Sequence, residues 1–182
     1  MSIGVESVFK SILSHLSSID DCSYKFVTAT YSRPELSGGS PLSSYYCFLS
    51  FERFYVRMMS LLLNNYSRKR HLQPLTYAFL DYPAKLFSGN STPHVHAVMA
   101  TRHELSLKMD DNAALIEALF RSLGGLNATL LIQPLPGPDD LRRALRYAMR
   151  TTREVADTAS DQFILLPKAK SEPNYQPERF QK

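Results

Sequence analysis

Two histidines stand one residue apart in the segment His94-Val95-His96. The surrounding residues, HVHAVMAT, are typical of a β-strand, in which alternate side chains project from the same face, so both imidazoles would point the same way. Imidazoles two residues apart along a strand, about 6 to 7 Å, can both reach one divalent cation. The pair therefore predicts a metal site. The alternative is one surface histidine and one histidine that makes a hydrogen bond in the core.

A carboxylate that could complete this site, Asp81, ends the apolar segment TYAFLD. If this strand and the HVH strand are antiparallel neighbours, Asp81 lies near the start of the HVH strand. Two imidazoles and a carboxylate leave coordination positions for water and phosphate oxygens, which a metal that acts on phosphates needs. Asp81 could instead be a turn residue at the end of a strand. His103 falls beyond the HVH strand, and we expect it at the surface.

A tyrosine stands among arginines in a helix expected from Asp139 to about residue 157. At 100° per residue, Tyr147 falls outside the apolar stripe, beside Arg143 and Arg150 at i−4 and i+3. Positive charge nearby would favour the phenolate form and hold a phosphate, so Tyr147 could be a nucleophile. The alternative is a surface tyrosine with a half-buried ring.

A second basic segment, SRKRH, contributes Arg68, Lys69 and Arg70. Lys and Arg total 21 against 17 Asp and Glu, a formal net charge of +4, and the pI is about 9.1. This mild basicity is compatible with a nucleic-acid partner. Each basic segment could equally be a solvated helix face or loop.

The elements that must position these residues follow from hydrophobic periodicity and from turn residues. We expect helices over 5–19, 44–64, 112–123 and 139–157, and strands over 25–32, 75–82, 94–101 and 128–135. Four strands with helices between them predict an α+β fold, with one antiparallel sheet and helices packed mainly on one face.

Composition and motifs exclude several classes of protein. Of the 182 residues, 44% are apolar and 21% are charged, which is typical of one globular domain. The sequence contains no P-loop, GxSxG, HExxH or CxxC motif, and no apolar run of about 18 residues that could cross a membrane. The N-terminus is a poor signal peptide, and the cysteines form no disulfide framework. We therefore expect a cytoplasmic protein without a membrane partner.

Taken in order, the strand KFVTATYS, a strand ending in an acid, the HVH strand and a later Tyr-x-x-basic helix resemble the HUH endonucleases. The chain is most similar to the rolling-circle replication initiators (Rep proteins) of plasmids and phages. His94-Val95-His96 matches the family's histidine motif, and Tyr147-Ala148-Met149-Arg150 matches its Tyr-x-x-Lys helix. TYAFLDY looks like the strand that supplies the acidic ligand, here Asp81 in place of the more usual Glu. The resemblance covers about residues 24–157, and Arg150 replaces the customary lysine.

The resemblance implies a sheet of five antiparallel strands of the ferredoxin-like or split-RRM type. We expect an N-terminal amphipathic helix over 1–23, a nuclease domain over 24–166 and a tail over 167–182 that is disordered or serves as a contact arm. His94, His96 and Asp81 would hold Mg²⁺ or Mn²⁺.

The resemblance also implies a reaction. Tyr147, assisted by Arg150, would nick single-stranded or cruciform origin DNA, leaving a 5′-phosphotyrosine and a free 3′-OH, and the reverse reaction would rejoin the strands. Residues expected to contact DNA phosphates are Arg68, Lys69, Arg70, Arg143 and Arg146. A host helicase would act in trans. Alternatives are a relaxase, a single-tyrosine transposase, or a non-catalytic nucleic-acid-binding protein with the same fold.

Overall fold

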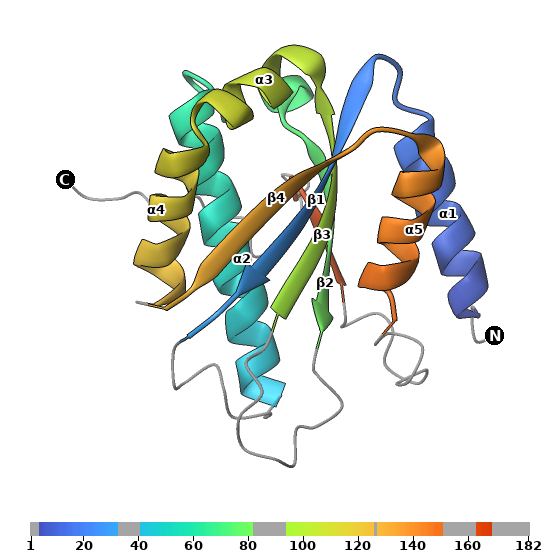
Figure 1. Cartoon of the computed structure of the whole chain (residues 1–182), viewed down its shortest axis with the longest axis horizontal. Helices are drawn as coiled ribbons and strands as arrows, with labels where there is room; N and C mark the ends of the chain where they lie inside the picture. Colours follow the sequence, from blue (N-terminus) through green and yellow to red (C-terminus); the bar gives the residue numbers. More distant parts are fainter. Residues whose placement is uncertain (1–3, 33–40, 82–93, 126, 151–162, 169–182) are drawn as a thin grey trace.

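The computed structural model describes residues 4–32, 41–81, 94–125, 127–150 and 163–168, with only the backbone for 41–46. These residues form an α+β fold around one antiparallel sheet with the strand order β4-β1-β3-β2-β5 (Figure 1). The strands are β1 (Cys22–Thr30), β2 (Leu75–Asp81), β3 (His94–Arg102), β4 (Thr129–Leu135) and β5 (Phe163–Leu166). The predicted fold class is confirmed, and it is consistent with the ferredoxin-like type.

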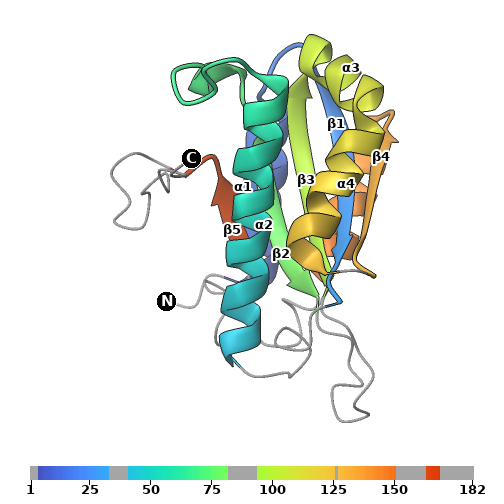
Figure 2. The ribbon, with the colours of Figure 1, turned by 90° about the vertical axis from the view of Figure 1, so that its left-hand side faces the viewer.

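Helices cover both faces of the sheet, which corrects the prediction that they pack mainly on one face. One face carries α2 (Pro41–Leu62), α3 (His103–Asp111) and α4 (Ala113–Gly124), which lie in front of the sheet in Figure 2. The other face carries α1 (Val5–Ser17) and α5 (Pro138–Ala148). The reason lies in β3, where Val95 joins one apolar cluster and Val98 the other, so both faces of this strand need cover.

The N-terminal helix α1 belongs to the core beneath the second face. Its buried side chains, Phe9, Ile12 and Leu16, are in the apolar cluster that also contains Leu141 and Leu145 of α5. The helix is amphipathic, as its apolar spacing predicts. Its role here is to support α5, the helix that bears Tyr147.

Most element boundaries agree with the prediction to within a few residues. Helix α4 ends at Gly124, and Gly125 adopts a φ of 105°, the left-handed backbone that favours glycine after a helix. Helix α3 and the short strand β5 were not predicted from the residue pattern. Helix α5 ends at Ala148 and is followed by a turn through Arg150, which corrects the prediction that this helix reaches residue 157. Residues 169–182 of the expected tail lie outside the described residues. None of the described helices has both the length and the apolar character needed to cross a membrane.

A lysine is buried between β1 and α3. Lys25 is 1% exposed, and its Nζ donates a hydrogen bond to Asp110 Oδ1 at 2.7 Å. We expect Asp110→Ala to lower the free energy of unfolding by about 2 kcal/mol, because the buried ammonium loses a charged acceptor. The adjacent substitution Asp111→Ala, at an exposed position of the same helix, should change it by less than about 0.5 kcal/mol. Urea unfolding measures both, and equal changes would contradict the assignment.

Candidate active site

The register of the sheet brings the predicted metal ligands to one face. Strands β2 and β3 are antiparallel neighbours in which Asp81 pairs with His94 and Phe79 pairs with His96. On its other side, β3 pairs with β1, placing Thr30 beside His94 and Thr28 beside His96. The two imidazoles and the carboxylate therefore share the face covered by α1 and α5, at the end of the sheet where β2 finishes and β3 begins.

His96 is buried and contacts a partner on each side of its ring. Its Nε2 lies 3.2 Å from Asp81 Oδ2, and its Nδ1 lies 3.2 Å from Thr28 Oγ1. The imidazole also stacks on Phe26, with ring centroids 5.5 Å apart and an interplanar angle of 16°. With 3% of its surface exposed, the ring has little freedom to reorient.

His94 lies next to His96 in a half-buried position. The two ring centroids are 6.3 Å apart, and Nδ1 of His94 lies 3.0 Å from Thr30 Oγ1. Burial lowers the pKa of His94 below its ordinary value of 6.5, and the neighbouring His96 lowers it further. A lowered pKa favours the neutral imidazole, the form that can bind a metal ion.

Asp81 is paired with an arginine from a distant part of the chain. The carboxylate is 1% exposed. Arg150, in the turn after α5, donates to Asp81 Oδ2 from Nε at 3.1 Å and also from Nη2. A buried carboxylate needs such charged or hydrogen-bonded partners, and Arg150 and His96 both supply them here.

Tyr147 joins this group from helix α5. Its ring centroid lies 5.0 Å from that of His96 and 6.0 Å from that of Phe26, both in edge-on contacts. The Arg150 guanidinium lies over the phenol ring, with Cζ 4.5 Å from the centroid. Tyr147 is still 45% exposed, because the buried stripe of α5 faces the sheet and leaves the tyrosine at its border. A phenol accessible to a ligand thus contacts a predicted metal ligand.

The donor set suits a divalent cation, although the three groups are not gathered around one point. Within the described ranges, no cluster of three or more His, Cys, Asp or Glu side chains could hold a metal ion as arranged. His96 Nε2 and Asp81 Oδ2 are nonetheless 3.2 Å apart, close to the separation of about 3 Å between adjacent ligands of an octahedral ion with bonds of 2.0–2.1 Å. His96 and Asp81 are therefore spaced as two adjacent metal ligands would be, with His94 alongside.

The ion pair between Arg150 and Asp81 can be tested by substitution. We expect Arg150→Gln to lower the free energy of unfolding by about 1 to 3 kcal/mol in EDTA, because buried Asp81 loses a charged donor. Mn²⁺ should then raise the melting temperature of this variant more than that of the wild type, since the guanidinium no longer competes for Asp81. The control is Arg143→Gln, which removes an exposed pair with Asp140. Thermal unfolding with and without Mn²⁺ measures both effects, and identical behaviour of the two variants would contradict the assignment.

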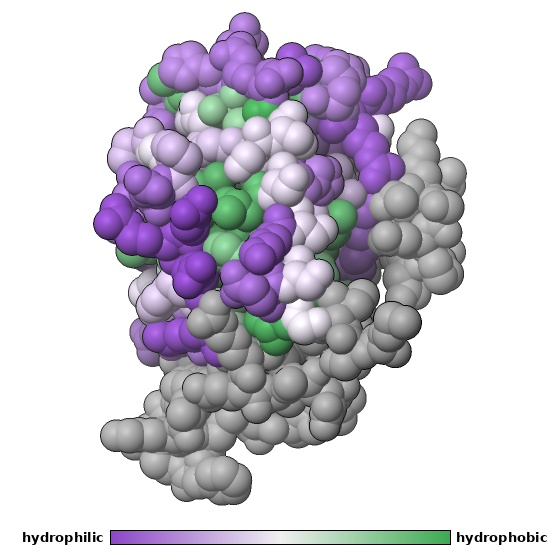
Figure 3. Space-filling view, turned by 90° about the vertical axis from the view of Figure 1, so that its right-hand side faces the viewer, coloured by the Kyte–Doolittle hydropathy of each residue, from purple (hydrophilic) through white to green (hydrophobic). Residues whose placement is uncertain are grey.

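The predicted DNA-binding residues on α5 are oriented differently from one another. Arg143 pairs with Asp140 and is well exposed, on the same side of the helix as Tyr147 and Arg150. Arg146 instead turns to α1, where it lies 4.0 Å from Glu6 and over the ring of Phe9. Figure 3 shows the face formed by α1 and α5, where hydrophilic residues surround a smaller hydrophobic area. Of the arginines on and after α5, Arg150 contacts the candidate site, at Asp81 and at the Tyr147 ring.

The SRKRH segment is not brought to the site. Arg68, Lys69 and Arg70 precede β2, whereas Asp81 ends it, so a seven-residue strand of about 20 Å separates them. Arg70 donates hydrogen bonds to the backbone carbonyls of Pro167 and Lys168, so it holds the chain after β5.

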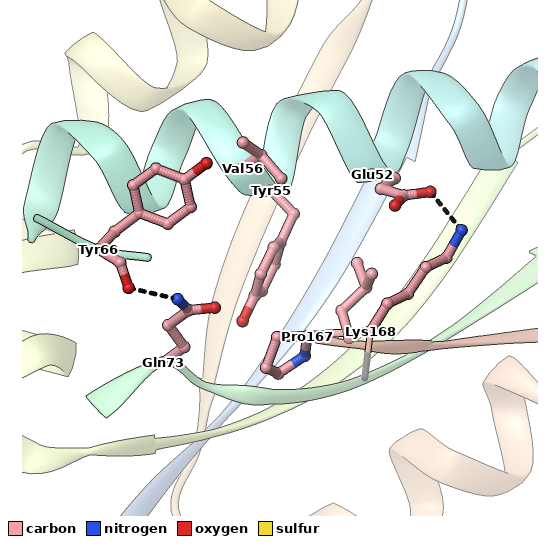
Figure 4. A pocket seen from close by; sticks show the side chains of 8 residues that line it. Glu52, Tyr55, Val56, Tyr66, Gln73, Pro167 and Lys168 are labelled. Carbon is pink, nitrogen blue, oxygen red and sulfur yellow. Dashed lines mark hydrogen bonds and ion pairs between the residues drawn. The ribbon is translucent and has the colours of Figure 1, made fainter. Parts of the chain in front are cut away.

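A pocket close to this segment lies on the opposite side of the sheet from Tyr147. It is bordered by α2 and by the chain after β5, where Lys168 pairs with Glu52 at 2.7 Å and Gln73 donates to the backbone of Tyr66 (Figure 4). These polar groups are already paired within the pocket. It is separate from the histidine site.

The strand KFVTATYS is part of the resemblance, but the sequence assigned no role to three of its residues that contact the histidines: Phe26, Thr28 and Thr30. They alternate along the strand, as residues on one face must. Their spacing matches the His-x-His spacing. Knowledge of which residues pair between the two strands would therefore have identified them as neighbours of the histidines.

No family model matches the chain, and no similar protein was found among curated proteins or solved structures.

Proposed function

We propose that this protein is a metal-dependent endonuclease that nicks and rejoins single-stranded DNA through Tyr147, in the manner of a rolling-circle replication initiator. One observation supports this most strongly. Tyr147 comes from α5, far along the chain from β3, yet its ring lies 5.0 Å from that of His96. A nucleophile and a predicted metal ligand in contact at an accessible position is the arrangement that the reaction needs.

Each residue has a definite part in this proposal. His94, His96 and Asp81 would bind Mg²⁺ or Mn²⁺, which would supply positive charge to the scissile phosphate. The Tyr147 hydroxyl loses its proton and its oxygen forms a bond to phosphorus, while the bond from phosphorus to the 3′ oxygen breaks and that oxygen takes up a proton. The products are a 5′-phosphotyrosine and a 3′-OH, and the number of phosphoester bonds is unchanged, so the reaction is reversible without ATP. Arg150, beside the phenol ring, and Arg143 can pair with phosphate oxygens.

A second candidate is a nucleic-acid-binding protein that uses the same face without cutting DNA. The ion pair between Arg150 and buried Asp81 favours it, because the guanidinium occupies a carboxylate that a metal would need. The two candidates differ in one respect that can be measured. Only the endonuclease forms a covalent bond to DNA.

The test uses the full chain with a pool of single-stranded oligonucleotides of random sequence, labelled at either the 3′ or the 5′ end. With Mn²⁺, we expect the 3′ label to remain on the protein after denaturation, because the tyrosine keeps the strand that lies 3′ of the nick. The 5′ label should leave with the released 3′-OH fragment. EDTA should abolish the transfer. Non-covalent binding without label transfer would support the second candidate.

A further inference from the structure

Each of the two site histidines contacts a threonine hydroxyl through Nδ1. Thr28 Oγ1 lies 3.2 Å from His96 Nδ1, and Thr30 Oγ1 lies 3.0 Å from His94 Nδ1. The same relation occurs twice because the β1–β3 register pairs Thr28 with His96 and Thr30 with His94. The two contacts are therefore equivalent and repeat every second residue along the paired strands.

These contacts determine which ring nitrogen is available to the site. An imidazole whose Nδ1 is engaged on one side presents Nε2 on the other. In His96 this is the nitrogen that lies 3.2 Å from Asp81 Oδ2. A bond between a second-layer group and the outer nitrogen of a metal-binding histidine fixes both the tautomer and the ring orientation.

A hydroxyl has a property here that a carboxylate or a carbonyl lacks, since it can both donate and accept a hydrogen bond. When neutral His96 carries its proton on Nε2, that group donates to Asp81, and Nδ1 accepts from the Thr28 hydroxyl. When Nε2 gives its lone pair to a cation, the proton must sit on Nδ1, and the Thr28 oxygen then accepts it. The Thr28 hydroxyl can therefore hydrogen-bond with Nδ1 of His96 both with and without the cation.

We infer that Thr28 and Thr30 are positioning residues of the metal site, which orient the imidazoles of His96 and His94, and that the hydrogen bond between Thr28 and His96 reverses its direction when a cation binds Nε2 of His96. This inference rests on the proposed function. A valine at either position would keep the shape and strand preference of threonine but would leave Nδ1 without this partner.

The test measures Mn²⁺ affinity on the full chain without DNA, from the electron paramagnetic resonance signal of free Mn²⁺. We expect Thr28→Val and Thr30→Val each to weaken binding about 10- to 100-fold. Thr28→Ser, which keeps the hydroxyl, should remain within about threefold of the wild type. The control is Thr129→Val, since Thr129 is exposed on β4 and pairs with Thr30 in the same row of the sheet.

A second readout separates positioning from a general loss of structure. The ¹⁵N shifts of the His96 ring should move from an Nε2–H to an Nδ1–H tautomer when Mg²⁺ is added to the wild type and to Thr28→Ser. If Thr28→Val does not fold, Thr28→Ala replaces it in both measurements.

The outcomes distinguish this inference from the function on which it rests. If the wild type binds no Mn²⁺, the metal-dependent function fails and the inference fails with it. If the wild type binds Mn²⁺ and Thr28→Val binds it equally well, only the inference is overturned. Serine and valine variants that are equally weak would also overturn it, because the hydroxyl would then not be the group that matters.

Discussion

Replacement of Tyr147 by phenylalanine is expected to abolish the covalent attachment of single-stranded DNA, by at least about 10³-fold in rate, because no oxygen remains to attack phosphorus. The fold should not change. The phenylalanine ring can keep the edge-on contacts with His96 and Phe26 and the position under Arg150. The measurement is the amount of 3′-labelled DNA that stays on the denatured protein in the presence of Mn²⁺.

The matched control for this experiment is Tyr24→Phe. Tyr24 lies on β1, two residues from Phe26, and its hydroxyl donates to the backbone carbonyl of Leu16 in α1. This variant loses a tyrosine hydroxyl on the face of the sheet that α1 and α5 cover, but away from the histidines, and it should attach DNA as the wild type does. Undiminished attachment in Tyr147→Phe would mean that another residue is the nucleophile.

Replacement of His96 by glutamine is expected to weaken Mn²⁺ binding by at least about 100-fold, since a direct ligand contributes more than the outer groups whose loss costs 10- to 100-fold. DNA attachment should fall with it. His96 is the predicted ligand with the most contacts, because its ring meets Asp81, Thr28, Phe26 and Tyr147. Calorimetric titration with Mn²⁺ and the label-transfer assay measure the two effects.

The control variant is His103→Gln. His103 begins α3 at the far end of β3 and is exposed, so its replacement should leave both Mn²⁺ binding and DNA attachment unchanged. Equal metal affinity of the His96 and His103 variants would show that His96 is not a ligand. Loss of metal affinity without loss of DNA attachment would show that the reaction does not require the metal.

The grouping of His94, His96 and Asp81 could be predicted because it depends on local geometry. Alternation along a strand places the two histidines on one face. The antiparallel pairing of sequential strands then brings Asp81 beside them. Both relations are regular properties of sheets, so the spacing in the sequence was sufficient.

Other features depend on contacts that spacing does not determine. The ion pair between Asp81 and Arg150 joins residues 69 positions apart, and the contact of Tyr147 with His96 depends on how α5 docks. Strand β5 has only four residues, too few to separate it from other short apolar runs. Helix α3 follows β3 directly at Arg102 and His103, without the glycine or proline that would have marked the change.

Arg70 illustrates the limit of an argument from charge alone. A run of basic residues suggests contact with phosphate, but the Arg70 guanidinium donates to backbone carbonyls of Pro167 and Lys168. Arg146 likewise contacts α1. In both cases the side chain contacts another part of the fold, and only the arrangement of elements around it could reveal this.

The central claim is that Tyr147 is the group that bonds to DNA, next to the two histidines. The most direct measurement is mass spectrometry of the protein after reaction with single-stranded DNA and Mn²⁺, nuclease trimming and proteolysis. We predict a nucleotide joined through its 5′ phosphate to Tyr147, absent when EDTA replaces Mn²⁺. A nucleotide on any other residue, or no modified peptide from a protein that binds DNA and Mn²⁺, would contradict the account.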